Sequence, residues 1–319
     1  MNILTINFGG IGDEILFLPT LISLKKEFPN SKITLALEPR SKSIKDLTNT
    51  IDNLFLIDIK GKNKYFELIK LVFKARNGNF DMVISSGGNK LVSALLFIMG
   101  IKKRYGYDTG RLSRILLTKA VPLNKNQYAC AMYHDLILPI TDIKTFLPEI
   151  NVDKPEKIPN SVLIHPGVSK MSVQKGLTKT VSADIWAKII EMLIKCGKQV
   201  ILVGGPDDAE VIKKIEKALP SLLTIKEKND LHTYPIKNVT EESISALLSP
   251  ALPDEVPQQV DDDVFIQPDI ILSSYCPITP ASFINMYGKI KTIRDLAVLI
   301  GKAEKFICSD SAPLHVAVA

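Results

Sequence analysis

The chain has 319 residues, of which 46% are hydrophobic and 23% charged, a composition typical of globular proteins rather than disordered ones. Its length corresponds to about two domains. No apolar run approaches the roughly 18 residues of a membrane-spanning helix, and the strand-like start at 2–7 is unlike a secretory signal. The four cysteines stand far apart, so they indicate no metal site and fit a reducing cytosol.

Positive charge gathers in the first half of the chain. Residues 1–150 hold 21 Lys and Arg against 13 Asp and Glu, a net charge of +8, whereas residues 151–319 carry −2. Such a basic half favours an anionic partner, either a phosphorylated acceptor or a membrane surface, and a solvated helix–loop face is the alternative. Nucleic acid is disfavoured because aromatic residues, on which bases could stack, make up only 7% of the chain. The densest cluster comprises Lys102, Lys103 and Arg104, followed by Arg111, Arg114 and Lys119.

In chain order, strand-like and helical patterns alternate through the first half. The predicted strands are 3–7, 32–37, 54–57 and 82–85, and the predicted helices are 13–28, 45–50, 65–76 and 90–99. Pro19 falls inside the first helix and is expected to kink it or to begin its regular part. This alternation predicts βα units around a parallel sheet.

A polar stretch with two prolines, 151–159, is predicted to be the linker between two domains. Strands are then predicted at 161–164, 200–203 and 305–309, and helices at 182–196, 209–218 and 293–303, with another beginning after 311. Ser182 is the expected N-cap of the 182–196 helix, and Gly197 the residue that ends it. The proline-rich segment 222–282 breaks the rhythm and is predicted to be an insertion or a long loop.

Ligands of parallel sheets bind where strands lead into helices, and the first such junction is rich in glycine. It includes Gly9, Gly10 and Gly12 and is followed by Asp13 and Glu14. The glycines would open helix amides to an anion, although their spacing is not the G-x-G-x-x-G of a dinucleotide site. The two acidic residues could alternatively do no more than stabilise the helix dipole.

Three further junctions lie in the second half. The second, 165–169, precedes Lys170, Lys175 and Lys179, which could bind phosphate or form a solvated basic loop. The third, 204–208, fits a tight turn better than a ligand site. At the fourth, the amides of Ser311 and Ala312 would suit a diphosphate and Asp310 a sugar hydroxyl, whereas a lone helical His315 is more often a core residue.

Several chemistries lack their motifs. The chain contains no G-x-x-x-x-G-K-[ST], no G-x-S-x-G and no H-E-x-x-H, and its four histidines have no metal-ligand spacing. The acidic run 261–263 could mimic a metal-binding motif, but its surroundings favour a solvated loop.

Together, the junctions resemble glycosyltransferase family nine, the heptosyltransferases of lipopolysaccharide synthesis. Three blocks carry the resemblance. They are the start, with Gly12-Asp13 and Leu18-Pro19; His165-Pro166-Gly167-Val168-Ser169, followed by Lys179, Trp186 and Gly204-Gly205-Pro206-Asp207; and Gly288-Lys289 and Leu296-Ala297-Val298-Leu299-Ile300, followed by Asp310-Ser311-Ala312-Pro313-Leu314-His315.

The resemblance implies the glycosyltransferase B architecture, an α/β fold of two Rossmann-like domains with parallel sheets facing across a cleft. Residues 1–150 would take the acceptor and residues 160–319 the nucleotide-sugar donor. The implied reaction is metal-independent, inverting transfer of a heptose or related sugar, usually from ADP-heptose, to a lipid-anchored glycan. It would take place in the cytoplasm, with peripheral contact at the cytoplasmic face of the inner membrane.

The resemblance also implies roles for single residues. Asp13 would be the catalytic base. Gly10 and Gly12, from the first junction, and Arg104, from the basic cluster, are expected near the acceptor or its phosphates. The donor would be held by Ser169, Lys179, Asp310, Ser311, Ala312 and His315.

This sequence departs from the family pattern in ways that keep other functions open. Ala312 stands where the family usually has glycine, the 169–179 loop is longer than expected, and the chain stops inside the last motif. An incomplete donor domain is therefore expected. The alternatives are a non-catalytic nucleotide-sugar or glycan-binding protein and, more distantly, a nucleotide-sugar epimerase.

Overall fold

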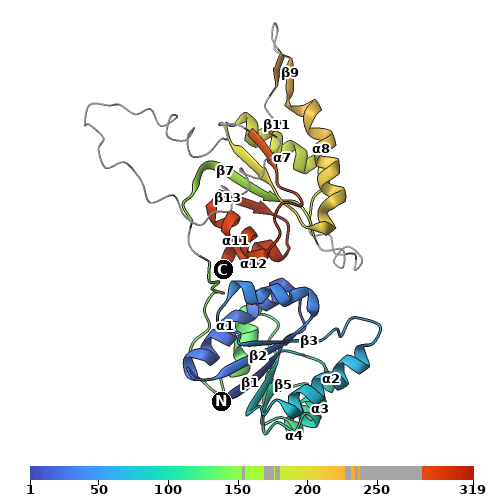
Figure 1. Cartoon of the computed structure of the whole chain (residues 1–319), viewed down its shortest axis with the longest axis vertical. Helices are drawn as coiled ribbons and strands as arrows, with labels where there is room; N and C mark the ends of the chain where they lie inside the picture. Colours follow the sequence, from blue (N-terminus) through green and yellow to red (C-terminus); the bar gives the residue numbers. More distant parts are fainter. Residues whose placement is uncertain (153–154, 169–175, 177–179, 227–230, 234–235, 238–281) are drawn as a thin grey trace, which may run out of the picture. The chain divides into compact units, whose positions relative to one another are not determined.

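The computed structural model describes residues 1–152, 155–168, 176, 180–226, 231–233, 236–237 and 282–319 (Figure 1). The chain divides into two compact units, one formed mainly by Met1–Asn151 and the other by Val152–Ala317. Both units are layered α/β structures built on parallel sheets, as the alternating sequence pattern predicts.

The first unit contains a six-stranded, wholly parallel sheet with the strand order β3-β2-β1-β4-β5-β6. The order reverses between β1 and β4, and a ligand crevice in such sheets forms at the reversal. In register, Ile3 of β1 pairs with Ile33 of β2 and Met82 of β4. The strands are β1 (Asn2–Ile6), β2 (Lys32–Leu37), β3 (Asn53–Leu56), β4 (Met82–Ser85), β5 (Lys103–Tyr107) and β6 (Lys119–Val121).

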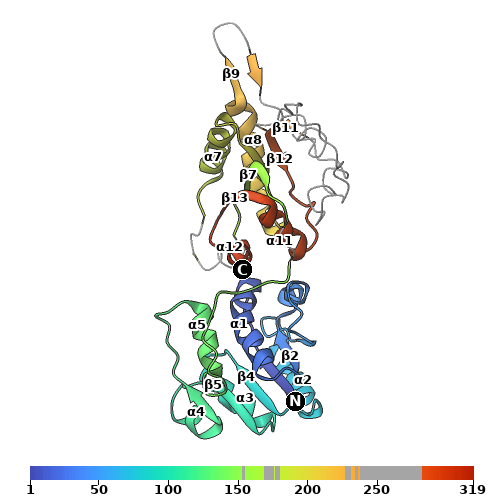
Figure 2. The same cartoon turned by 90° about the vertical axis from the view of Figure 1, so that its left-hand side faces the viewer.

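Helices cover both faces of this sheet (Figure 2). Right-handed crossovers place α1 and the 3-10 helix η1 on one face and α2, α3 and α4 on the other. α1 is the most buried helix, and it continues through Pro19. The helices are α1 (Ile11–Glu27), η1 (Pro39–Leu47), α2 (Lys64–Asn77), α3 (Lys90–Ile98), α4 (Arg111–Leu116), α5 (Ala129–His134) and the 3-10 turn η2 (Asp135–Ile137).

The predictions for this unit need correction in three places. The helix predicted at 45–50 is instead the end of η1, a 3-10 helix that begins at Pro39, whose fixed φ suits a first helical position. The strands β5 and β6 and the helix α4 were not expected, because the basic residues among them mask their short apolar pattern. The helix predicted from residue 13 begins two residues earlier, at Ile11.

The second unit contains a five-stranded parallel sheet in the order β11-β12-β8-β7-β13. Its strands are β7 (Ile158–His165), β8 (Gln199–Leu202), β11 (Ile236–Lys237), β12 (Ser282–Asn285) and β13 (Ala303–Cys308). Its helices are α7 (Ala183–Lys195), η3 (Pro206–Asp208), α8 (Ala209–Leu223), α11 (Ile293–Lys302) and α12 (Ala312–Val318). A separate antiparallel pair joins β9 (Thr224–Lys226) to β10 (Leu231–Thr233).

Caps and turns of this unit follow the sequence closely. The Ser182 hydroxyl accepts a hydrogen bond from the Ile185 amide, and Gly197 has a φ of +76° after α7, which confirms both predicted helix ends. β7 begins inside the predicted 151–159 linker, so the linker is shorter than expected. Of the segment 222–282, only the end of α8, the strands β9 to β11 and the start of β12 are described, and the predicted insertion otherwise lies outside the described residues. No helix in the described part of the chain is long and apolar enough to cross a bilayer.

Candidate active site

Asp13 lies in the first turn of α1, directly after the glycine turn that follows β1, at the carboxyl edge of the first sheet. Asp13 Oδ2 accepts a hydrogen bond from the Gly10 amide at 2.8 Å, and its Oδ1 accepts one from the Tyr133 hydroxyl at 3.3 Å. A Cβ on Gly9 would lie 2.2 Å from that of Asp13, so glycine is needed for this close approach. Gly10 caps α1, and Gly12 is buried in its first turn. The structure therefore brings Gly10, Gly12 and Asp13 together, as expected.

Behind this turn lies a buried carboxyl group on Glu14. Its Oε2 accepts a hydrogen bond from Asn7 Nδ2 at 3.1 Å, whereas Oε1 has no hydrogen-bond partner among the described residues. Burial raises the pKa of Glu14 well above the usual value, against the lowering effect of the Asn7 hydrogen bond. Asn7 Oδ1 in turn accepts a hydrogen bond from Ser86 Oγ at 2.6 Å, so this chain of contacts joins the ends of β1 and β4.

Two cations lie beside the same turn, and both follow neighbouring strands. Lys60, after β3, donates from Nζ to the Phe8 carbonyl at 3.4 Å. The guanidinium of Arg40, after β2, would lie 3.9 Å from a Cβ on Gly10. Glu38, the residue after β2, is buried, and desolvation raises its pKa although the charges of Lys60 and Arg40 oppose that shift. The carboxyl edge of the sheet thus combines carboxyl groups with exposed positive charge.

Arg104, expected near the acceptor, lies elsewhere. It pairs with Val83 near the start of β5, rather than at the strand ends that surround Asp13. Its Nε donates to the Leu116 carbonyl and its Nη1 to the Ile101 carbonyl, both at 2.6 Å. The structure does not bring Arg104 to the glycine turn, because its guanidinium joins the segments that precede β5 and β6.

In the second unit, a hydroxyl network closes the junction between β7 and β13. Ser309 Oγ lies 2.7 Å from both the Pro166 carbonyl and Thr180 Oγ1, and Thr180 Oγ1 lies 2.7 Å from the same carbonyl. The buried indole of Trp186 donates to Thr180 Oγ1 at 3.1 Å. This network ties the strand ends to the start of α7.

The expected donor-binding residues after β13 lie together. Asp310 is exposed, Ser311 donates from Oγ to the Ser309 carbonyl at 3.3 Å, and Ala312 opens α12, which also carries the half-buried His315. Ser169 and Lys179 lie outside the described residues.

A buried contact between a histidine and a carboxylate joins the other two junctions of this unit. His165 Nε2 lies 3.3 Å from Asp208 Oδ2, which also accepts a hydrogen bond from the Gly205 amide at 2.7 Å. A Cβ on Gly167 would lie 1.6 Å from Asp208 Oδ1, and one on Gly204 would lie 2.5 Å from Ile212. These contacts give the third junction the tight-turn geometry that its glycines predict.

Sequence reasoning missed several polar residues of the first site. Glu38 and Ser86 directly follow predicted strands, and Lys60 follows another by three residues. Because the carboxyl ends of parallel strands share one edge, that position was the available signal. Tyr133 carried no such signal, since α5 was not predicted and the residue is distant in sequence.

Comparison with known proteins agrees with these junctions. The family model for glycosyltransferase family 9 (heptosyltransferase) matches residues 68–227, half of the chain. The chain belongs to glycosyltransferase family 9. Lipopolysaccharide heptosyltransferase 3 of Escherichia coli K12 is a similar protein, 25% identical over 221 residues. That match covers 65% of this family 9 chain and 64% of the E. coli protein, less than two thirds of its length.

Solved structures support the fold of this family 9 member. A family 9 glycosyltransferase from Veillonella parvula matches with a TM-score of 0.64 at 18% identity, covering 99% of this chain and 77% of the other. The E. coli ADP-heptose lipopolysaccharide heptosyltransferase II matches with a TM-score of 0.63 at 16% identity, covering 99% and 81%. At these identities the matches establish the α/β fold with two parallel sheets, that of glycosyltransferase B heptosyltransferases.

Proposed function

We propose that this protein is an inverting glycosyltransferase that moves a heptose or related sugar from a nucleotide-sugar, ADP-heptose in the first instance, to a glycan acceptor such as a lipopolysaccharide core. Membership of family 9 and the names of its relatives support this reaction. The observation that carries the proposal is the oriented carboxylate of Asp13 at the switch point of the first sheet.

In this mechanism Asp13 removes the proton from the acceptor hydroxyl as that oxygen attacks the anomeric carbon. An alcohol is a weak nucleophile, so direct displacement gains from a base at the attacking oxygen. The diphosphate leaves from the opposite side of the sugar, and the configuration at carbon inverts. Burial favours the protonated form of the neighbouring Glu14, which therefore adds little negative charge beside Asp13.

The charged groups around the two junctions suggest how the substrates divide between the units. The first unit takes the acceptor, whose phosphates would meet Arg40 and Lys60 beside the glycine turn. The second unit takes the donor, whose diphosphate would be held by Ser169 and Lys179 with the amides at Ser311 and Ala312. The other donor contacts would come from Asp310 and His315. This arrangement neutralises the diphosphate without a metal ion, and the proposed place of action is the cytoplasmic face of the inner membrane.

The test is turnover with defined substrates. The chain is incubated with ADP-heptose and a phosphorylated core acceptor, with EDTA present, and the product is measured by mass spectrometry. We expect a product that is one heptose heavier than the acceptor, with an inverted anomeric linkage by NMR. Donor binding in calorimetry without any product would favour the non-catalytic binding protein. Turnover that stops in EDTA and returns with a divalent cation would contradict the metal-free mechanism.

A further inference from the structure

The outward face of α2 is apolar. Phe66, Ile69 and Phe73 are 67%, 53% and 61% exposed and lie on the side opposite the buried Leu71 and Ala75. An amphipathic surface helix normally turns charged or polar residues outward. In the second unit, α8 follows that rule, since its exposed residues between 209 and 219 are lysines and glutamates. The stripe on α2 therefore needs an explanation beyond the folding of the first unit.

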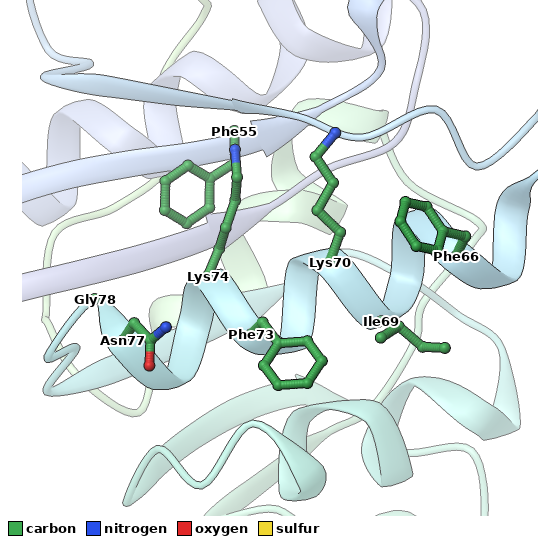
Figure 3. Close-up of a pocket in the computed structure, with 8 residues that line it drawn as sticks. All are labelled: Phe55, Phe66, Ile69, Lys70, Phe73, Lys74, Asn77 and Gly78. Carbon is green, nitrogen blue, oxygen red and sulfur yellow. The ribbon is translucent and has the colours of Figure 1, made fainter.

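Two lysines of α2, Lys70 and Lys74, lie beside this stripe and point toward β3, away from Ile69 and Phe73 (Figure 3). A shallow groove of about 510 Å³ runs along α2 beside β3, between aromatic side chains and the stems of Lys70 and Lys74 (Figure 3). The Nζ of Lys74 lies 4.8 Å from the centre of the Phe55 ring, and Lys64 is placed similarly, 5.0 Å from that of Tyr65. Long lysine stems can cover apolar surface while their charged ends reach outward.

The same mixture continues over α3 and α4, which lie on the same side of the sheet. Arg76, at the end of α2, donates from Nε to the Ile98 carbonyl at 2.9 Å, so α2 and α3 are neighbours, and α3 packs against α4. On α3 and α4 the large apolar side chains that are 48–76% exposed are Leu91, Phe97, Ile98, Leu112 and Ile115. We call these residues, with Tyr65, Phe66, Ile69 and Phe73, the α2–α4 face.

Most of the net charge of the first half lies in the segment that forms this face. Residues 64–116 contain ten Lys and Arg against three Asp and Glu, a net charge of +7. Two of the three acidic residues are paired within the segment, Glu67 with Lys70 and Asp108 with Arg114. A surface that carries both basic and large apolar side chains suits the interface of a lipid bilayer, where phosphate headgroups lie next to the hydrocarbon of the acyl chains.

We infer that the α2–α4 face docks the protein on an anionic lipid bilayer. The aromatic and aliphatic side chains enter the headgroup region, and the lysines and arginines remain level with the lipid phosphates. The sign of the charge favours this occupant over a second copy of the chain, which would bring two basic segments of like charge together. The inference rests on the proposed function only in that a lipid-anchored acceptor requires such contact.

Flotation with vesicles tests the inference. We expect the chain to float with phosphatidylcholine vesicles containing 30% phosphatidylglycerol in 0.1 M salt, and to bind pure phosphatidylcholine at least 10-fold more weakly. Raising the salt to 0.5 M shortens the Debye length to roughly half and should weaken binding several-fold. The triple variant Phe66→Ser, Ile69→Ser and Phe73→Ser should bind roughly 10- to 100-fold more weakly, because less apolar area enters the bilayer.

A matched control comes from the second unit. Ile185 and Met192 on α7 are 47% and 65% exposed, so Ile185→Ser with Met192→Ser removes comparable exposed apolar groups and should leave vesicle binding unchanged. Circular dichroism checks that both variants remain folded.

Unchanged flotation of the triple variant would overturn the inference. So would the absence of flotation combined with self-association in sedimentation that the triple variant abolishes, because the face would then bind a second copy. Transfer to a detergent-solubilised acceptor is measured separately, so failure of the transfer proposal leaves the vesicle result intact.

Discussion

Replacing Asp13 by Asn distinguishes two roles of this residue, a catalytic carboxylate and a helix cap. Asn has the same shape, so it fits the close contact with Gly9, and its side-chain oxygen can still accept the Gly10 amide that now lies 2.8 Å from Oδ2. The amide nitrogen would face the Tyr133 hydroxyl, which can turn to accept rather than donate. The loss of stability should therefore stay below about 1 kcal/mol, a change in Tm of roughly 2–4 °C.

Loss of a catalytic base should have a much larger effect on the rate than on stability. As the base, Asp13→Asn should lower kcat by about 10²–10⁴-fold, equivalent to roughly 2.7–5.4 kcal/mol in the barrier. Donor affinity in calorimetry should hardly change, since the proposed donor contacts are on the second unit. Kinetics with ADP-heptose and thermal unfolding of the same preparations give both numbers, and Tyr133→Phe is the milder companion variant. Turnover within a few-fold of the parent, at an unchanged Tm, would refute the reasoning.

Three further predictions concern other parts of the molecule. Because the pKa of Glu14 is raised in the folded protein, its contribution to the free energy of unfolding is full below the ordinary pKa of 4.5 and is lost as pH rises through the folded pKa. The free energy of unfolding measured with urea should therefore fall between pH 4.5 and 8, and Glu14→Gln should reduce that fall. Gly167→Ala should cost about 1–3 kcal/mol because its Cβ would overlap Asp208, whereas Gly205→Ala, whose nearest contact would be 3.8 Å, is the control that should leave Tm nearly unchanged. Lys179→Ala should weaken ADP-heptose binding in calorimetry by about 1.5–3 kcal/mol, and unchanged affinity would remove Lys179 from the diphosphate site.

Strong local patterns made much of the fold predictable. The strands at 32–37 and 82–85 were predicted residue for residue, because each is a short apolar run between polar turns. The capping residues Ser182 and Gly197 correctly predicted where α7 begins and ends. The strands β5 and β6 were not predicted, because Lys103, Arg104 and Lys119 interrupt their apolar pattern. Their place in the sheet is set by pairing with strands that are distant in sequence.

The candidate site was predictable only where its residues are close in sequence. Gly10, Gly12 and Asp13 share one turn, and the residues from Asp310 to His315 share one junction. Tyr133 reaches Asp13 across 120 residues of sequence, and no local pattern predicts such a contact. Arg104 was grouped with the acceptor by charge alone, although its partners are backbone carbonyls that only the folded chain provides.

The hydroxyl network of the second unit also supplies an optical reporter. Trp186 is the only tryptophan of the chain, so its fluorescence arises from a single place. Its indole N–H is bonded to Thr180, the residue that follows Lys179 and contacts Ser309. Intrinsic emission, excited at 295 nm, therefore reports directly on the junction proposed to receive the donor diphosphate. Titration with ADP can be followed on the unlabelled protein, with no change to its sequence.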